Sequence, residues 1–180
     1  WGSLAHKLLN STDVKRDVNE MSEKDADEAA LALKKVLKVN PENQRAHMLL
    51  AAVYQRKGNS AGAEKEIRAA IALNPSNPFF HFTLGLLLKN EGRYKEALKE
   101  FKSVEQLRPN KPDVLFHIGM TYKAEGNCQE AVPNLEKFLT AAKRDEGPFA
   151  RKKHEAIRTI KECRRGTKQK PLEKKPPIYR

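Results

Sequence analysis

The sequence predicts an all-α protein built as an array of antiparallel helix pairs. Three sets of residues recur every 34 positions along the 180-residue chain. They are Pro41, Pro75 and Pro109; Gly58, Gly92 and Gly126; and Ala29, Ala63, Ala97 and Ala131. A constant period of this length indicates that one helical unit is repeated and stacked on itself.

Each set has a physical role in a helix pair. The prolines disfavour helix in the residue before them, so they end one helix before the next begins. The glycines permit the turn inside a pair, where a positive φ is often needed. The alanines are small, which allows close packing of adjacent helices. Two further sets form an apolar stripe on each second helix: Leu33, Ile67, Phe101 and Leu135, and Val36, Ala70, Val104 and Phe138.

The spacing predicts helices near 44–57, 60–73, 78–91, 94–107, 112–125 and 128–143. Each first helix carries a small residue, at Ala51, Gly85 and Gly119, and the segment from Gly92 to Ala97 reads GRYKEA. These features resemble the tetratricopeptide repeat family. The resemblance implies a right-handed α-solenoid of antiparallel helix pairs, with three full units at 44–77, 78–111 and 112–143.

The two ends depart from the pattern. Residues 1–43 are expected to hold a short N-terminal helix and a degenerate first repeat, with a clear second helix only near 24–38. Residues 144–166 are expected to contain a capping helix, because a terminal repeat must cover its exposed apolar face. Residues 167–180 are rich in Pro and Lys, so a disordered or extended tail is expected. Because the chain begins with Trp1-Gly2-Ser3, we treat those residues as a possible cloning remnant.

The resemblance implies a concave groove lined by the first helix of every unit. The predicted groove residues are Arg45, Met48, Leu49, Ala52, Arg56, Phe79, Phe82, Leu86, Lys89, Phe116, His117, Met120 and Lys123. The set is apolar in its middle and basic along one edge. A contiguous exposed apolar patch usually marks a binding site. We therefore expect an adaptor that binds an amphipathic or extended peptide with apolar anchors and acidic flanks.

Two alternatives to peptide binding remain open for the groove. Its residues could pack among themselves or be covered by the N-terminal segment, or they could join copies of the chain into a homo-oligomer. Some relatives bind a terminal carboxylate with a clamp of Lys, Asn and Arg. The corresponding clamp positions here are Met48 and Ala52, or Phe82 and Leu86, which argues against that activity.

The net charge of +12 is concentrated at one end of the chain. Residues 151–180 hold twelve Lys or Arg and three Glu, whereas the first 150 residues carry a balance of only +3. This asymmetry favours a contact with an anionic partner. The alternative function is therefore binding of nucleic acid, an anionic membrane surface or an acidic protein, through Arg151, Lys152, Lys153, Arg164 and Arg165.

Cys128 and Cys163 are expected at the same level of two antiparallel helices. They could form a disulfide or remain two buried thiols, depending on the compartment. We expect a cytoplasmic protein, or an extracytoplasmic one if the disulfide forms. His47 and His81, in the position usually held by Trp in the family, are expected to be hydrogen-bonded structural residues.

The sequence carries no pattern typical of an enzyme or a metal site. It has no Gly-rich phosphate loop, no nucleophile elbow and no HExxH or CxxC spacing. It also has no apolar run of 18 or more residues, so no transmembrane segment is predicted. We expect a soluble, non-catalytic scaffold without a cofactor or metal.

Overall fold

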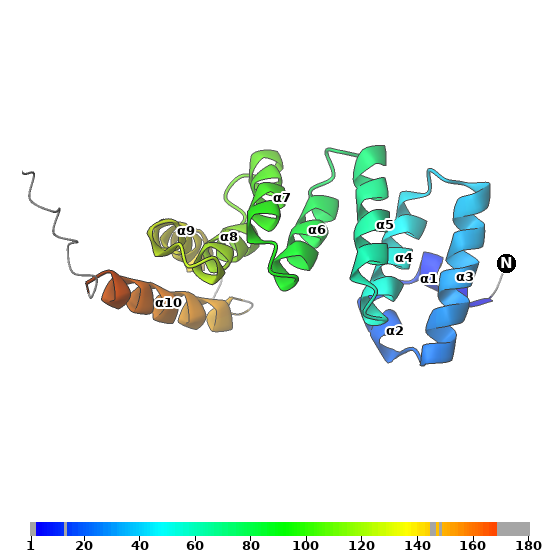
Figure 1. Ribbon diagram of the computed structural model, residues 1–180, viewed down its shortest axis with the longest axis horizontal. Coiled ribbons are helices and arrows are strands. Elements are labelled where there is room, and N and C mark those ends of the chain that lie inside the picture. Colours follow the sequence, from blue (N-terminus) through cyan, green and yellow to red (C-terminus); the bar gives the residue numbers. More distant parts are fainter. Residues whose placement is uncertain (1–2, 13, 145–146, 148, 169–180) are drawn as a thin grey trace, which may run out of the picture. The chain divides into compact units, whose positions relative to one another are not determined.

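The computed structural model describes residues 3–12, 14–144, 147 and 149–168, and in this part of the chain the secondary structure consists of helices joined by turns, without a strand (Figure 1). The predicted all-α fold class is confirmed. The helices are α1 (Ser3–Asn10), α2 (Val14–Glu20), α3 (Glu23–Val39), α4 (Gln44–Arg56), α5 (Ser60–Leu73), α6 (Pro78–Asn90), α7 (Tyr94–Leu107), α8 (Pro112–Ala124), α9 (Cys128–Ala141), the 3-10 helix η1 (Ala142–Arg144) and α10 (Ala150–Lys168).

The helices belong to two compact units, Trp1–Leu107 and Arg108–Arg180. In the first unit α4 packs tightly against α5, and α6 against α7. The helices α3 and α5 also contact the helix that follows each of them, so neighbouring pairs are joined. In the second unit α8 packs against α9, and α10 contacts both.

Asparagine side chains begin four of the helices. Asn43, Asn59, Asn77 and Asn127 precede α4, α5, α6 and α9, and each side chain accepts a hydrogen bond from a backbone N–H of the first turn. These bonds satisfy N–H groups that have no partner within the helix. Asn43 and Asn77 are 34 residues apart, as are the prolines, so the caps follow the repeat period.

The turn inside each regular pair requires glycine. Gly58, Gly92 and Gly126 have φ angles of 70°, 76° and 85°. These angles lie in the left-handed region, which glycine adopts without the steric penalty of a Cβ atom. The glycine period therefore corresponds to one backbone conformation that is repeated in three turns.

Close packing within the pairs explains the small residues of the first helices. A Cβ atom added at Gly85 would lie 2.6 Å from Cε1 of Phe101, and one added at Gly119 would lie 2.6 Å from Cγ of Leu135. Phe101 and Leu135 are fully buried. The apolar stripe of the second helix thus fills the space that the missing side chain leaves.

Helix α2 lies beside α4 and runs in the same direction. Nη2 of Arg45 donates to the carbonyl oxygen of Ser11 at 2.6 Å, and Nη2 of Arg56 donates to the carbonyl oxygen of Met21. These partners are 34 and 35 positions apart in the sequence. Because the separation is close to one repeat at both ends, α2 stands where the first helix of a preceding repeat would stand.

Helix α10 has a corresponding place in the second unit. Three side-chain contacts join it to α8, and each joins residues 39 positions apart. They are Lys152 with Asp113, Thr159 with Met120, and Glu162 with Lys123. Because the separation is constant, α10 runs parallel to α8, as the first helix of a further repeat would. The separation of 39 exceeds the 34-residue period by five, so the connection before α10 is five residues longer than in a regular repeat.

Helix α10 also extends beyond its predicted end. The prediction that the tail begins at residue 167 is wrong, since the helix continues through Gly166 to Lys168. Glycine weakens a helix by about 1 kcal/mol relative to alanine but does not by itself end it. The rest of the predicted tail, residues 169–180, lies outside the described residues.

Candidate functional site

A groove with a volume of about 870 Å³ opens between α2, α4 and α6 in the first unit. We call it the α4–α6 groove. Eight of the predicted groove residues line it: Arg45, Met48, Leu49, Ala52, Arg56, Phe79, Phe82 and Leu86. Lys89, also predicted, is half-buried on α6 and is not among the lining residues. The groove therefore gathers the predicted residues of two helices in one place.

Helix α2 supplies a wall that the sequence analysis did not assign to the groove. Val18 and Asn19 line it, together with Gln44 and Gln55 near the two ends of α4. Val18 could have been found by extending the register of Ala52 back by 34 residues. The repeat pattern contains no corresponding signal for Asn19 and Gln44.

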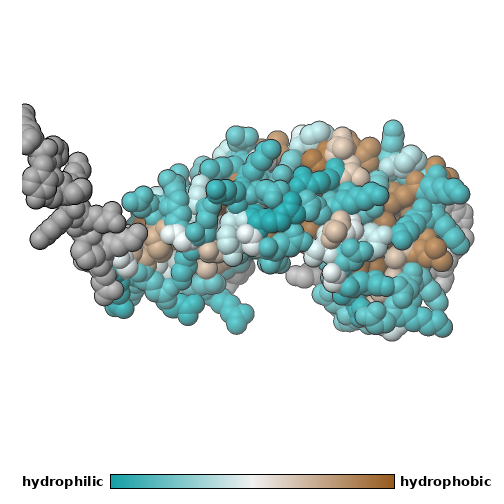
Figure 2. All heavy atoms as spheres, viewed as in Figure 1, coloured by the Kyte–Doolittle hydropathy of each residue, from teal (hydrophilic) through white to brown (hydrophobic). Residues whose placement is uncertain are grey.

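The side of the groove formed by α6 is apolar and accessible. The Phe79 side chain is 59% exposed, and Phe82 and Leu86 are half-buried. Figure 2 shows hydrophobic residues in brown at several places on the visible face of the first unit, whereas the visible face of α8 to α10 is mostly hydrophilic. Burial of one such side chain by a ligand would contribute roughly 1.5–3 kcal/mol.

The groove is electropositive. Its lining contains Arg45 and Arg56 and no Asp or Glu. Each guanidinium group donates one hydrogen bond to a backbone carbonyl next to α2, as described above. A guanidinium group has five N–H donors, so each arginine can hold α2 and still attract an anionic group.

In the second unit, the prediction that Phe116 faces solvent is wrong. Phe116 is only 5% exposed, and its ring centroid lies 5.2 Å from that of Phe138. Ala156 and Ile160 of α10 belong to the same buried cluster. Phe116 is buried because α10 covers the face of α8 on which it lies.

The other predicted residues of α8 are also engaged within the second unit. The Sδ atom of Met120 accepts a hydrogen bond from Thr159 at 3.8 Å, and Lys123 forms an ion pair with Glu162. The His117 ring packs edge-on against Phe116, with centroids 5.5 Å apart. Intramolecular contacts therefore occupy these residues in the second unit.

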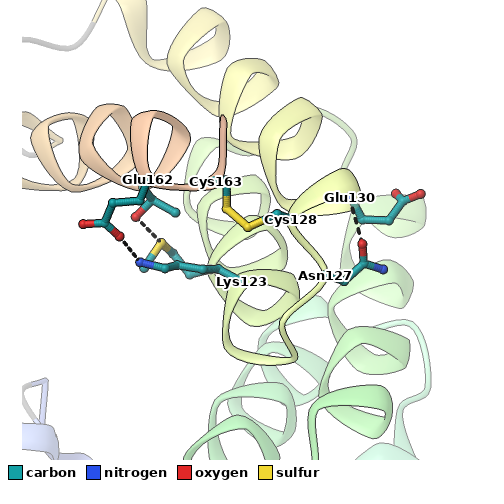
Figure 3. The surroundings of a disulfide bond; sticks show 8 residues. Lys123, Asn127, Cys128, Glu130, Glu162 and Cys163 are labelled. Atoms are coloured by element: carbon teal, nitrogen blue, oxygen red, sulfur yellow. Dashed lines mark hydrogen bonds and ion pairs between the residues drawn. A yellow bond between two sulfur atoms is a disulfide. The ribbon is translucent and has the colours of Figure 1, made fainter. Parts of the chain in front are cut away.

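A disulfide joins Cys128 at the start of α9 to Cys163 near the end of α10 (Figure 3). Their Cα atoms are 5.3 Å apart, and Cys163 is buried. Of the two alternatives for these cysteines, the structure contains the bonded one. Figure 3 shows the ion pair between Lys123 and Glu162 near this bond, so a covalent and an ionic contact hold the same end of α10.

The structure separates the basic residues predicted to contact an anion. Lys152 forms an ion pair with Asp113, and Arg164 forms one with Glu136. The exposed residues Arg151 and Arg165 belong instead to a stripe along α10. Its members are separated by seven, three and four residues and are Arg151, Arg158, Lys161 and Arg165. We call these four residues the α10 basic stripe.

The two histidines at equivalent positions make equivalent contacts. In His47, Nδ1 lies 2.7 Å from Glu66 Oε2 and Nε2 lies 2.9 Å from the carbonyl oxygen of Pro41. His81 repeats this arrangement with Glu100 and the carbonyl oxygen of Pro75, at 2.7 and 2.8 Å. Each imidazole therefore links both helices of its pair to the turn before the pair.

An ion-pair cluster lies on α5 and α7. The Arg93 guanidinium donates to both carboxylate oxygens of Glu64, at 2.5 and 3.2 Å, and also to Glu96. The hydrogen bond from Arg93 lowers the pKa of Glu64, and a second hydrogen bond, from Arg68, acts in the same direction. Because Glu64 lies on α5 and Arg93 directly precedes α7, the cluster connects neighbouring helix pairs. None of its residues lines the α4–α6 groove.

Within the described residues, no group of three or more His, Cys, Asp or Glu is placed to hold a metal ion. No helix in this part of the chain is both long and apolar enough to cross a membrane.

Family models support the sequence resemblance. Three models described as tetratricopeptide repeat match residues 20–81, 53–113 and 112–145. Together they span the region in which the 34-residue period was found. No curated protein sequence matches the chain significantly.

Solved structures share the fold. A structure of MamA is 31% identical, with a TM-score of 0.59, and the match covers 67% of this chain and 64% of that one. PilF of Pseudomonas aeruginosa is 22% identical, with a TM-score of 0.65, over 89% and 74% of the two chains. The Yersinia enterocolitica type III secretion chaperone SycD, in complex with a peptide of the translocator YopD, is 17% identical, with a TM-score of 0.62, over 67% and 92%.

Proposed function

Since the chain belongs to the tetratricopeptide repeat family and is a protein-interaction scaffold, we propose that its α4–α6 groove binds a peptide segment of a partner protein. The partner supplies apolar side chains to the α6 wall and acidic groups toward Arg45 and Arg56. The proposed role is binding without catalysis.

The exposure of Phe79 within a concave, apolar lining is the observation that carries this proposal. An accessible apolar surface that is also hollowed is typical of ligand sites. The side chain of Phe79 is 59% exposed although it borders the groove, and Phe82 and Leu86 continue the same wall. A partner that covers this wall removes apolar area from water and so gains free energy.

The peptide-bound SycD structure supports the proposal by analogy of fold. In that complex a helical scaffold of similar fold holds a peptide of another protein. The analogy concerns the type of ligand only, because the identity of 17% shows the fold alone. The partner of this chain must be found by experiment.

A selection from a random linear peptide library displayed on phage tests the proposal. The protein is used as wild type, as Phe79→Glu and as the control Leu31→Glu. Phe79 and Leu31 are 59% and 57% exposed and lie in the same unit, but only Phe79 lines the groove. Glu in the first turn of α6 is compatible with the helix dipole, so we expect Phe79→Glu to fold.

We expect peptides enriched on the wild type to bind Leu31→Glu equally well and to lose binding to Phe79→Glu. Equal binding to all three proteins would place the peptide site elsewhere and overturn the proposal. Failure to enrich any peptide on the wild type would also count against it. Thermal melting followed by circular dichroism establishes that both variants remain folded.

The α10 basic stripe supports a second candidate function, the binding of an anionic surface. The first and last residues of the stripe are 14 positions apart, or about 21 Å along the helix. Cations in such a line release counterions when they bind a polyanion, so binding weakens steeply with salt. The stripe contains no aromatic residue, which disfavours stacking on single-stranded bases.

A salt titration with a DNA duplex and with phosphatidylserine vesicles tests this second function. We expect binding to weaken strongly between roughly 50 and 200 mM salt and to be lost in Arg158→Gln/Lys161→Gln. The control Lys95→Gln/Lys99→Gln removes the same charge from the exposed face of α7. If both double variants weaken binding equally, net charge rather than the stripe is responsible.

A further inference from the structure

Helix α10 covers a face of α8 that corresponds to the α6 wall of the α4–α6 groove. Phe116 and Met120 on α8 follow Phe82 and Leu86 on α6 by one period of 34 residues. Phe82 and Leu86 line the groove, whereas Phe116 is buried in a cluster that includes Ile160 of α10. Within its own unit, α10 therefore lies where a bound segment would lie on α8.

The non-covalent contacts of α10 with α8 and α9 are modest. Four described residues of α10 are buried, and one of them is a large aliphatic residue. They are Ala156, Thr159, Ile160 and Cys163. The ion pairs of α10 with α8 and α9 join side chains that are at least 31% exposed, and exposed pairs contribute little to stability because water screens them. The disulfide between Cys128 and Cys163 is therefore the strongest single contact that holds α10.

The disulfide is accessible to a reductant on one side. Cys128 is half-buried, whereas Cys163 is 3% exposed. A thiolate of a dithiol reductant attacks Sγ of Cys128, the S–S bond breaks, and its electron pair leaves on Sγ of Cys163, which takes up a proton. The second thiol of the reductant then attacks the mixed disulfide and releases Cys128 as a thiol. The protein gains two electrons and two protons, and the reductant leaves as a disulfide.

The contacts of α10 show which kind of helix fits this surface. Lys152 lies against Asp113 in the first turn of α8, and Glu162 lies against Lys123 in its last turn. Along this stretch the buried residues of α10 are spaced by three, one and three positions, which places them on one face of a helix. A helix fits when it has a basic residue at its start, an acidic residue ten positions later and small or apolar residues on the face between them.

We propose that the face of α8 and α9 beneath α10 is a second docking surface, for an amphipathic helix of a partner protein with this pattern, and that the disulfide between Cys128 and Cys163 controls access to it. In the oxidised protein α10 is covalently held on the surface and excludes the partner. In the reduced protein the non-covalent contacts alone hold α10, so the partner helix displaces it. The inference is independent of the α4–α6 groove, which belongs to the first unit.

Binding of α10 itself as a free peptide tests this inference. The probe is a synthetic, fluorescein-labelled peptide of residues 149–168 that carries Cys163→Ser and so cannot form a disulfide. Fluorescence anisotropy measures its binding to the full chain, as oxidised wild type, as wild type in dithiothreitol and as Cys128→Ser/Cys163→Ser. The tethered α10 competes with the probe, so the apparent affinity is proportional to the fraction of protein from which α10 is released.

We expect reduction to increase the affinity of the wild type for the probe by roughly 30- to 900-fold, the factor by which a typical disulfide shifts such an equilibrium. The serine double variant should bind as the reduced wild type does and should not respond to dithiothreitol. A probe with the additional change Ile160→Glu is the negative control, because it places a carboxylate on the buried face of the helix. This control should bind in neither redox state.

A charge exchange identifies the surface. A second probe carries Lys152→Glu, and both probes are titrated onto Asp113→Lys in the serine double variant. The ratio of their affinities should shift by at least about 2-fold toward the second probe, because the ion pair is then restored with opposite signs. The matched control is Glu130→Lys, which makes the same charge change in the first turn of α9. Figure 3 shows Glu130 pointing away from Cys163 and α10, so this control should leave the ratio unchanged.

Three results would overturn the inference. Equal affinity of the oxidised and the reduced wild type for the probe would show that the disulfide does not control access. Absence of binding to the reduced protein would show that the non-covalent contacts suffice to keep α10 in place. The same affinity ratio in Asp113→Lys and Glu130→Lys would place the probe on another surface.

Discussion

The ring of Phe101 lies against the backbone of Gly85, so that a Cβ atom placed on this glycine would come within 2.6 Å of Phe101 Cε1. Phe101 is fully buried on α7, the second helix of its pair. Protein interiors are packed too densely for such an overlap to be absorbed without movement. The stability of this helix pair therefore depends on the absence of a side chain at residue 85.

We expect Gly85→Ala to lower the free energy of unfolding by about 1–3 kcal/mol, because the new methyl group displaces the Phe101 ring. The higher helix propensity of alanine, worth up to about 1 kcal/mol, offsets part of this loss. Urea denaturation measures the change. Gly166→Ala in α10 is the matched control, since nothing lies near its added Cβ, and it should be stabilising. Equal gains in both variants would contradict the packing argument.

The disulfide between Cys128 and Cys163 should stabilise the docking of α10 on α9. It closes a loop with a sequence separation of 35, and disulfides of this kind typically contribute about 2–4 kcal/mol. We expect dithiothreitol to increase amide hydrogen exchange in α10 of the wild type. Cys128→Ser/Cys163→Ser should exchange as the reduced protein does and should not respond to dithiothreitol. An equal response of both proteins would show that the reductant acts elsewhere.

The pair of His47 and Glu66 should behave as one structural element. His47→Leu leaves a carboxylate that is only 14% exposed without its imidazole partner, and we expect a loss of about 1–3 kcal/mol. His47→Leu/Glu66→Leu should cost less than the sum of the two single changes, because both polar partners are then absent. Urea denaturation of the double-mutant cycle measures the difference. The same cycle at His81 and Glu100 should agree with it, and additive losses in both would refute the coupling.

The ion pair between Arg93 and Glu64 should make stability depend on pH. Since the hydrogen bond from Arg93 lowers the pKa of Glu64 in the folded chain, the unfolded chain binds more protons in acid. The stabilisation is present above the unfolded pKa, about 4.3, and is lost as the pH falls through the folded value. The wild type should thus be more stable than Arg93→Met at about pH 6, and this advantage should shrink toward about pH 3.

Urea midpoints across this pH range, with Lys99→Met as the control, measure the effect. Lys99 is an exposed cation on α7, the helix that begins directly after Arg93, so its removal should shift stability by a similar amount at every pH. A constant difference between the wild type and Arg93→Met would contradict the assigned cause of the pKa shift.

The repeat pattern was sufficient to predict the regular helices and most groove residues of α4 and α6, although it missed Gln44 and included Lys89, which does not line the groove. Glycine, proline and small-residue positions each express a local requirement, such as a positive φ at Gly92 or the close approach at Gly85, so they can be recognised in the sequence. The family frame then places Met48 and Phe82 on the face that lines the groove, where the structure also has them.

The burial of Phe116 could not be predicted in the same way. Phe116 and Phe82 occupy equivalent positions, and the difference between them arises from α10, a helix without the repeat signature. The ion pair of Lys152 with Asp113 joins residues 39 positions apart, which is five more than the repeat period. No local pattern in the sequence reveals this longer separation. Long-range contacts of the two end helices thus decide which groove positions stay accessible.

The end helices have a consequence for how such a chain can grow in evolution. Helix α2 stands one repeat length before α4, and α10 stands parallel to α8 after a longer connection. Each packs against the regular repeats of its own unit with a sequence unlike theirs. Duplication of a segment such as residues 44–77 would therefore lengthen the array without redesign of either terminus. Binding surface could be added in whole modules while the two closing helices stay unchanged.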